Sequence, residues 1–131
     1  MTRDYLANMS RREIAEADLA GLSRRGCVRF ALACAGRVVR ASADRQTLEA
    51  VRAWLACPCP RCAALAVAAA EAAYKISRGT LPHFAAANAS YATSDLIYTH
   101  RAWRAANCAD DAVEPPWQRR TLAVVRIGDR P

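Results

Sequence analysis

Apolar residues recur at helical spacing along most of this chain, most clearly between Ser23 and Arg40. One stripe in that segment repeats as expected for the buried side of an amphipathic helix. Its members are Val28, Ala31, Leu32, Ala35 and Val39. Arg29, Arg37 and Arg40 fall together on another side of the same segment, which indicates a solvated basic face.

Two further segments in the first half of the chain carry helix start signals. Ser10 and Glu13 form a capping box, so a helix is expected to begin there and to weaken at Gly21. Ser42 or Asp44 can cap another helix through a side-chain oxygen. The apolar stripe of that helix is expected to contain Leu48, Val51 and Leu55, with Trp54 beside it.

The next helical segment follows a break at Pro58 and Pro60, both of which remove a backbone donor. Pro60 is well placed as the first helical residue, because a missing N–H is harmless at that position. The helix is expected to stop at Gly79. Its buried stripe is expected to contain Cys62, Leu65, Ala69, Ala72 and Ile76.

The C-terminal third of the chain predicts one long helix, a loop and a last element. The long helix is expected from Pro82 to about Asn107. Its stripe is expected to contain Ala85, Ala89, Ala92, Leu96 and Trp103. The loop is marked by Asp110, Asp111, Pro115 and Pro116. The segment Trp117 to Ile127 fits a helix by its start signal and a strand by its β-branched run, and we favour the helix.

These elements predict a single all-α domain over residues 1–131, folded as a compact bundle of about five or six helices. Residues 1–9 are expected to form a flexible arm and residues 128–131 a tail. The composition agrees, because alanine is abundant and is the best helix former, whereas the chain has only 5 glycines.

No signal for secretion or for membrane insertion is visible. The first residues lack the charged start and apolar core of a signal peptide. The longest apolar run, Cys62 to Ala73, is too short to cross a bilayer. We therefore expect a cytoplasmic protein without membrane insertion, in which the 6 cysteines stay reduced.

A net charge of +7 favours an acidic partner, which can be nucleic acid, a membrane surface or a protein. Lys75 is the only lysine, so nearly all of the cations are arginines. The arginines are spread over every segment and are not interleaved with aromatic residues. This distribution argues against a nucleic-acid interface, which needs a focused basic surface with stacking platforms.

Three thiols stand close together in the sequence at Cys57, Cys59 and Cys62. Thiolates are soft ligands for zinc, copper or iron–sulfur clusters, and zinc usually takes four donors in a tetrahedron. A fourth donor would have to come from elsewhere in the chain. The candidates are Cys27, Cys34, Cys108, His83 and His100. Metal binding, thiol redox chemistry and simple packing at a rigid bend therefore all stay open for this triplet.

Catalytic signatures are not visible in the sequence. No Gly-rich phosphate loop, His-Glu-x-x-His pattern or Ser/His/Asp order is present, so we expect a protein that is not an enzyme. His83 and His100, the only histidines, are expected to be surface groups. Asp95 would need a partner if it were buried, such as Tyr91, Tyr98 or an arginine.

Several segments resemble the Imm-5-like family of immunity proteins. The sequence VRFALACAGRVV (residues 28–39) is similar to the opening helix of that family, and TLEAVRAWL (residues 47–55) is similar to the helix that follows it. An alanine-rich tract at residues 63–74 and WQRR at residues 117–120 stand in the expected order. The chain departs from the family in its thiol triplet and in having only His100 within residues 89–102.

The resemblance implies an all-helical protein that binds a cognate bacterial toxin and blocks it without catalysis and without a cofactor. A basic chain would repel the basic cleft of a nuclease, so an acidic or membrane-active toxin is favoured. A helical face of such a protein should meet the toxin. Aromatic residues and arginine dominate interface hot spots, so we expect residues of these types to make the contact. The predicted partner-binding residues are Trp54, Trp103, Trp117, Arg29 and Arg37.

Overall fold

The computed structural model describes residues 14–109 and 115–129, and within these ranges every regular element is a helix. In chain order they are the 3-10 helix η1 (Glu16–Leu19) and the α-helices α2 (Arg24–Val38), α3 (Ser42–Ala56), α4 (Pro60–Ser77), α5 (Leu81–Tyr91), α6 (Tyr98–Cys108) and α7 (Pro115–Gly128). The all-α prediction is confirmed. The helix favoured over a strand for the segment Trp117 to Ile127 is confirmed as well.

Three of these helices begin with a side-chain cap. The Ser23 hydroxyl accepts from the N–H of Gly26 at 3.0 Å, and the Thr80 hydroxyl accepts from the N–H of His83 at 3.2 Å. At the start of α4 the cap is a sulfur, because Sγ of Cys59 accepts from the N–H of Cys62 at 3.4 Å. Each side chain satisfies an amide that the first turn leaves without an intrahelical partner.

Pro60 is the first residue of α4, as predicted. The helix ends at Ser77, and Arg78 and Gly79 follow with φ values of 36° and 75°. Left-handed backbone of this kind ends a helix and is least costly for glycine, so the predicted stop at Gly79 is confirmed within two residues.

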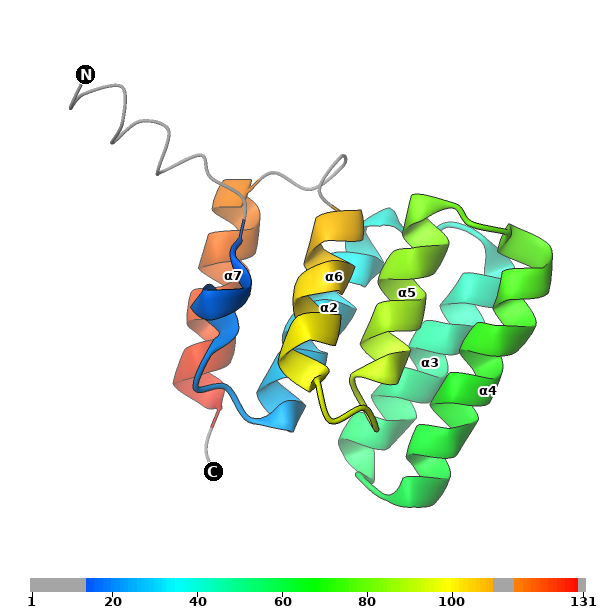
Figure 1. The fold of residues 1–131 in the computed structure, drawn as a ribbon, viewed down its shortest axis with the longest axis horizontal. Coiled ribbons are helices and arrows are strands. Elements are labelled where there is room, and N and C mark those ends of the chain that lie inside the picture. Colours follow the sequence, from blue (N-terminus) through cyan, green and yellow to red (C-terminus); the bar gives the residue numbers. More distant parts are fainter. Residues whose placement is uncertain (1–13, 110–114, 130–131) are drawn as a thin grey trace.

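Figure 1 shows α7 and η1 at one end of the molecule, the α3–α4 pair at the other end, and α2, α5 and α6 between them. The larger core cluster joins η1, α2, α5, α6 and α7 around the fully buried Phe30. A smaller cluster joins α2, α3 and α4 around Val28, Val51 and Ala66. Because α2 contributes to both clusters, it is the central helix, and its predicted stripe is buried apart from the half-buried Leu32.

The predicted buried stripe of α4 is wrong. Leu65 and Ile76 are 57% and 74% exposed, and Cys62 is only half-buried. The buried residues of α4 are Ala63, Ala66, Ala70 and Ala73. Both faces of this helix are apolar, and the face without bulky side chains is the one that packs between α3 and α5, because small residues let helix backbones approach closely.

The long helix predicted from Pro82 to Asn107 is interrupted. The chain turns between Tyr91 and Tyr98, and Leu96, placed by the sequence on a buried stripe, is 89% exposed. Asp95 lies in this turn, where its carboxylate accepts from the N–H of Ile97 at 3.2 Å. A short acidic side chain that bonds its own backbone competes with helical hydrogen bonding, which explains the break.

Ser42 and Asp44 do not cap α3, whose N-cap residue is Ala41 without a side-chain hydrogen bond. Asp44 is buried instead.

The capping box predicted at Ser10 and Glu13 lies outside the described residues, as do residues 1–9, 110–114 and the last two residues of the predicted tail. Pro115 and Pro116, expected in a loop, are the first residues of α7. None of the described helices is long and apolar enough to cross a membrane.

Candidate functional site

The three predicted thiols meet at the connection between α3 and α4. Sγ atoms of Cys57, Cys59 and Cys62 all lie within 4.8 Å of one another, and we call this cluster the thiol corner. Cys57 ends α3, Cys59 caps α4 and Cys62 lies in the first turn of α4. Pro58 holds the intervening backbone out of a helix and Pro60 begins α4, so the short spacing folds into a convergent set of sulfurs.

The sulfurs of the thiol corner differ in acidity because of the hydrogen bonds between them. The pKa of Cys59 is lowered, first by the backbone N–H of Cys62 and then by the thiol of Cys62, which both donate to its sulfur. The pKa of Cys62 is raised to about 11, mainly because its thiol donates to Cys59. Of these two sulfurs, Cys59 therefore becomes a thiolate more readily than Cys62.

The thiol corner fits a thiophilic metal ion by its donor chemistry. A zinc ion with Zn–S bonds of about 2.3 Å requires S···S separations of about 3.8 Å. The three sulfurs already lie within 4.8 Å of one another. Cys57 is exposed and the other two sulfurs are half-buried, so an ion can reach them from solvent. Within the described ranges no histidine, carboxylate or fourth cysteine joins this group, so the described residues supply three ligands and leave a fourth position open.

The remaining cysteines lie elsewhere. All six cysteines fall within the described ranges and all are free thiols. Burial raises the pKa of Cys27 to about 11 and that of Cys34 to about 12, so these two thiols of α2 behave as small apolar residues. Cys108 is half-buried on α6, and burial raises its pKa as well.

The five predicted partner-binding residues do not share one surface. Trp54 is only 5% exposed and belongs to the smaller core cluster, so its role is packing. Trp103 is half-buried on α6 and its Nε1 donates to the carbonyl of Ile14 at 2.8 Å, which ties α6 to the N-terminal segment.

The other three residues gather where α2 meets α7. The guanidinium of Arg37 lies over the ring of Trp117, 4.5 Å from its centroid, as a cation–π contact. Arg29 lies towards the other end of the α2–α7 interface, where its Nη1 is 3.9 Å from a Cβ built on Gly128. Both arginines are exposed, as the predicted basic face of α2 requires. We call Arg29, Arg37 and Trp117 the α2–α7 face.

The prediction that both histidines are surface groups is wrong for His83. His83 is 2% exposed, and its Nδ1 lies 2.9 Å from Oδ1 of Asp44. The Ser77 hydroxyl donates to the other oxygen of Asp44 at 3.0 Å. No local signal reveals this pair, because the two residues are 39 positions apart in the sequence and lie on different helices.

The order of these buried groups differs from that of a hydrolase triad. The Ser77 hydroxyl donates to Asp44 and not to His83, so these three residues lack the serine–histidine hydrogen bond of such a triad. His100 is partly exposed and bonds Glu16 at 2.8 Å. Asp95 pairs with Arg101 at 2.9 Å, one of the partners that the sequence allowed for it, and this hydrogen bond lowers the pKa of Asp95.

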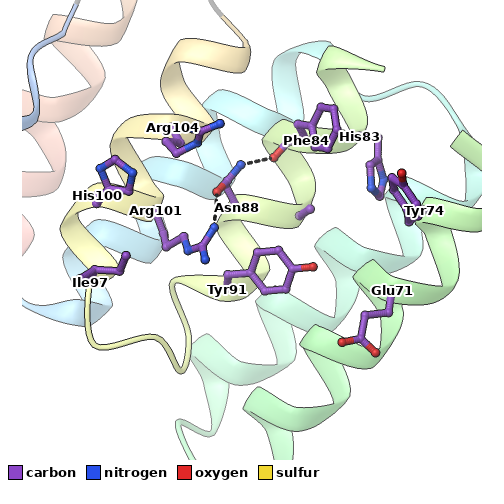
Figure 2. Close-up of a pocket in the computed structure, with 11 residues that line it drawn as sticks. Glu71, Tyr74, His83, Phe84, Asn88, Tyr91, Ile97, His100, Arg101 and Arg104 are labelled. Atoms are coloured by element: carbon purple, nitrogen blue, oxygen red, sulfur yellow. Dashed lines mark hydrogen bonds between the residues drawn. The ribbon is translucent and has the colours of Figure 1, made fainter. Parts of the chain in front are cut away.

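A pocket between α4, α5 and α6 is the second candidate site (Figure 2). His83 is part of its wall, together with Phe84, Tyr91, Arg101 and Arg104, which the sequence did not single out as a group. These residues come from two helices and from both sides of the turn that was missed, so helical spacing alone could not bring them together.

No protein-family model, curated protein or solved structure matches this chain. The resemblance to immunity proteins therefore stays a prediction.

Proposed function

We propose that this protein binds a thiophilic metal ion at the thiol corner. The observation that supports the proposal is the convergence of three sulfurs within 4.8 Å of one another at an accessible turn. Thiolates are soft donors that select zinc, copper(I) and similar ions over magnesium or calcium. Three thiolates with an open fourth position suit an ion that is exchanged or that completes its coordination with water or a further ligand.

Each residue of the thiol corner has a distinct part in this proposal. Cys59, with its lowered pKa, is expected to lose its proton first and to begin binding. The Cys62 thiol then releases the proton that it donates to Cys59, and its sulfur becomes a metal ligand. The backbone N–H of Cys62 continues to donate a hydrogen bond to the sulfur of Cys59. Cys57 closes the set from the end of α3. Binding releases protons, so the affinity should increase with pH.

The test is a titration of the reduced protein with Zn²⁺ against a chromophoric chelator, repeated with Cd²⁺ to observe the ultraviolet thiolate-to-metal absorption. About one equivalent should bind, and Cys59→Ser or Cys62→Ser should weaken binding by at least about tenfold, because each removes one of three thiolates. Cys108→Ser is the matched control, since this thiol lies outside the thiol corner.

Two results would contradict the proposal: less than about a tenth of an equivalent of bound metal, or Cys59→Ser binding as tightly as the wild type. The thiol-redox alternative makes a different prediction. If metal does not bind but the protein loses two hydrogen masses under a mild oxidant, and Cys59→Ser abolishes that loss, then Cys59 forms a disulfide with Cys57 or Cys62 instead.

A second candidate function is neutralisation of a cognate toxin, and the observation that favours it is the α2–α7 face. Arg37 is held over Trp117, so an aromatic residue and two exposed arginines are already positioned for an acidic partner. Such a pair loses less side-chain entropy on binding than two free side chains would.

Co-expression with the product of a neighbouring gene tests this second function. Wild-type protein should rescue growth against one such toxin, and Arg29→Glu combined with Arg37→Glu should abolish rescue by reversing the charge of the α2–α7 face. Arg52→Glu on α3 is the control, because Arg52 is an exposed arginine whose ion pair is with Glu49 on its own helix. Failure to rescue against every adjacent toxin would count against this function.

A further inference from the structure

The pocket between α4, α5 and α6 has a volume of about 520 Å³, within the range of small-molecule binding sites. Aromatic and aliphatic side chains form much of its wall, among them Tyr74, Phe84 and Ile97, all of which are exposed. Exposed apolar side chains around a hollow are typical of a ligand site, because a bound apolar body would remove their surface from water.

Arg101 is fixed in this wall before any ligand arrives. Its Nε donates to Asp95 at 2.9 Å, its Nη1 donates to Oδ1 of Asn88 at 3.3 Å, and its guanidinium lies 5.0 Å from the ring centroid of Tyr91. Asn88 is itself oriented, since its Nδ2 donates to the carbonyl of Phe84 at 2.8 Å (Figure 2). A positioning network of this kind lowers the entropy cost of binding.

The charges of the pocket are segregated. Arg101 and Arg104 lie one turn apart on α6, and the contacts described for Arg101 use only part of its five N–H donors. Arg104 is exposed and has no ion pair among the described residues. The carboxylate of the wall, Glu71, lies across the pocket on α4 (Figure 2).

We propose that this pocket binds a small organic carboxylate with a flat apolar body. Its ring would lie against Tyr91 and Phe84, and its carboxylate would be held by Arg104 and by the remaining donors of Arg101. Asp95 already neutralises one of the two arginines, so the α6 wall keeps one positive charge and matches a monoanion better than a phosphate dianion.

The experiment uses naphthalene-2-carboxylate and its neutral amide as matched probes, with binding followed by calorimetry on the full chain. The carboxylate should bind at least about tenfold more tightly than the amide, and Arg104→Gln should remove about tenfold of that affinity. Arg45→Gln, an exposed arginine on α3, is the charge-matched control and should bind as the wild type does. Glu71→Gln should bind equally well or slightly better.

The proposal is overturned if the two probes bind equally, if neither saturates below about 10 mM, or if Arg104→Gln leaves carboxylate binding unchanged. Thermal melts establish that each variant is folded, and Phe84→Ala supplies a second test of the apolar wall, expected to weaken both probes. Cys59→Ser should bind the carboxylate like the wild type, so failure here and failure of metal binding at the thiol corner are separate outcomes.

Discussion

At the scale of single residues, the thiol corner depends on one hydrogen-bonded pair. The sulfur of Cys59 receives two hydrogen bonds from Cys62, which stabilise its thiolate, whereas Cys62 acts as the donor and holds its proton more tightly. The position of Cys59 at the start of α4 works in the same direction, since a helix N-terminus attracts negative charge.

This asymmetry predicts the order in which the thiols react. With iodoacetamide, metal-free reduced protein should be alkylated at Cys59 at a lower pH than at Cys62, because the thiolate is the nucleophile and the pKa of Cys62 is about 11. Peptide mass spectrometry over about pH 6 to 10 measures both sites. Cys34, buried with a pKa of about 12, is the unreactive control until the protein unfolds. Equal rates at Cys59 and Cys62 would contradict the assignment.

Asp44 shows what a buried carboxylate requires in this fold. Ser77 donates to one of its oxygens, and His83 lies within hydrogen-bond distance of the other. Without these partners, the buried polar atoms of the carboxyl group would lack hydrogen bonds, which costs about 1–3 kcal/mol for each group left unsatisfied. The network also joins α3, the end of α4 and the start of α5 beside the pocket, so it helps to fix the wall that contains His83.

At the scale of elements, α4 is the clearest case of a helix whose buried face is not its bulkiest face. Ala66 is fully buried in the smaller core cluster, whereas the neighbouring Leu65 is 57% exposed. Alanine loses little entropy in a helix and allows close packing, so the tight contacts of α4 with α3 and α5 need small residues at this face.

Hydrophobicity alone suggests that Leu65 matters more for stability than Ala66. We expect the reverse, with the larger loss in the free energy of unfolding at position 66. Ala66→Leu should lower the free energy of unfolding by about 1–3 kcal/mol through overpacking. Leu65→Ala should change it by less than about 1 kcal/mol, because little of its side chain is removed from water. Urea unfolding of both variants measures the difference. A loss of more than about 2 kcal/mol for Leu65→Ala would restore the stripe predicted from the sequence.

The sequence predicted those features that depend on neighbouring residues. Pro60 as a helix start, Gly79 as a helix stop and the closeness of the three thiols all follow from local chemistry, and all three are present. The errors have long-range causes. Helical spacing cannot rank two apolar faces of α4, and it cannot foresee that Asp44 meets His83.

The turn between α5 and α6 was missed for a related reason. Its alanine-rich flanks read as one helix, and the signal against it was a single residue, Asp95. A contact from far along the chain also supports the turn, since Nη1 of Arg24 donates to the carbonyls of Ala92 and Asp95 at 3.0 and 2.6 Å. The pocket lies beside this turn, so a sequence pattern that predicts one continuous helix cannot predict the pocket.

At the scale of the whole molecule, the C-terminal end of α7 is tied to the start of α2. Asp129, just after α7, accepts from the N–H of Ser23 at 2.8 Å and from its hydroxyl. Ser23 is also the N-cap of α2, so one carboxylate links the C-terminal helix to the start of the central helix across 106 positions. A negative charge at this place is further favoured by the dipole of α2.

Gly26 leaves the space that this link needs. A Cβ at position 26 would lie 2.6 Å from Oδ1 of Asp129, so Gly26→Ala must displace the carboxylate, although alanine is the better helix former. Gly26→Ala should therefore lower the free energy of unfolding by about 1 kcal/mol in the wild type. In an Asp129→Ala background the same change should raise it by about 0.5–1 kcal/mol, because only the gain in helix propensity remains.

A double-mutant cycle measured by urea unfolding tests this reversal, since it isolates the coupling between positions 26 and 129. We expect a coupling energy of at least about 1 kcal/mol, which two residues in direct contact can reach. Gly36→Ala is the matched control, because a Cβ there meets nothing within 4 Å and its effect should be the same in both backgrounds. If Gly26→Ala has equal effects with and without Asp129, then the carboxylate does not hold α7 against α2.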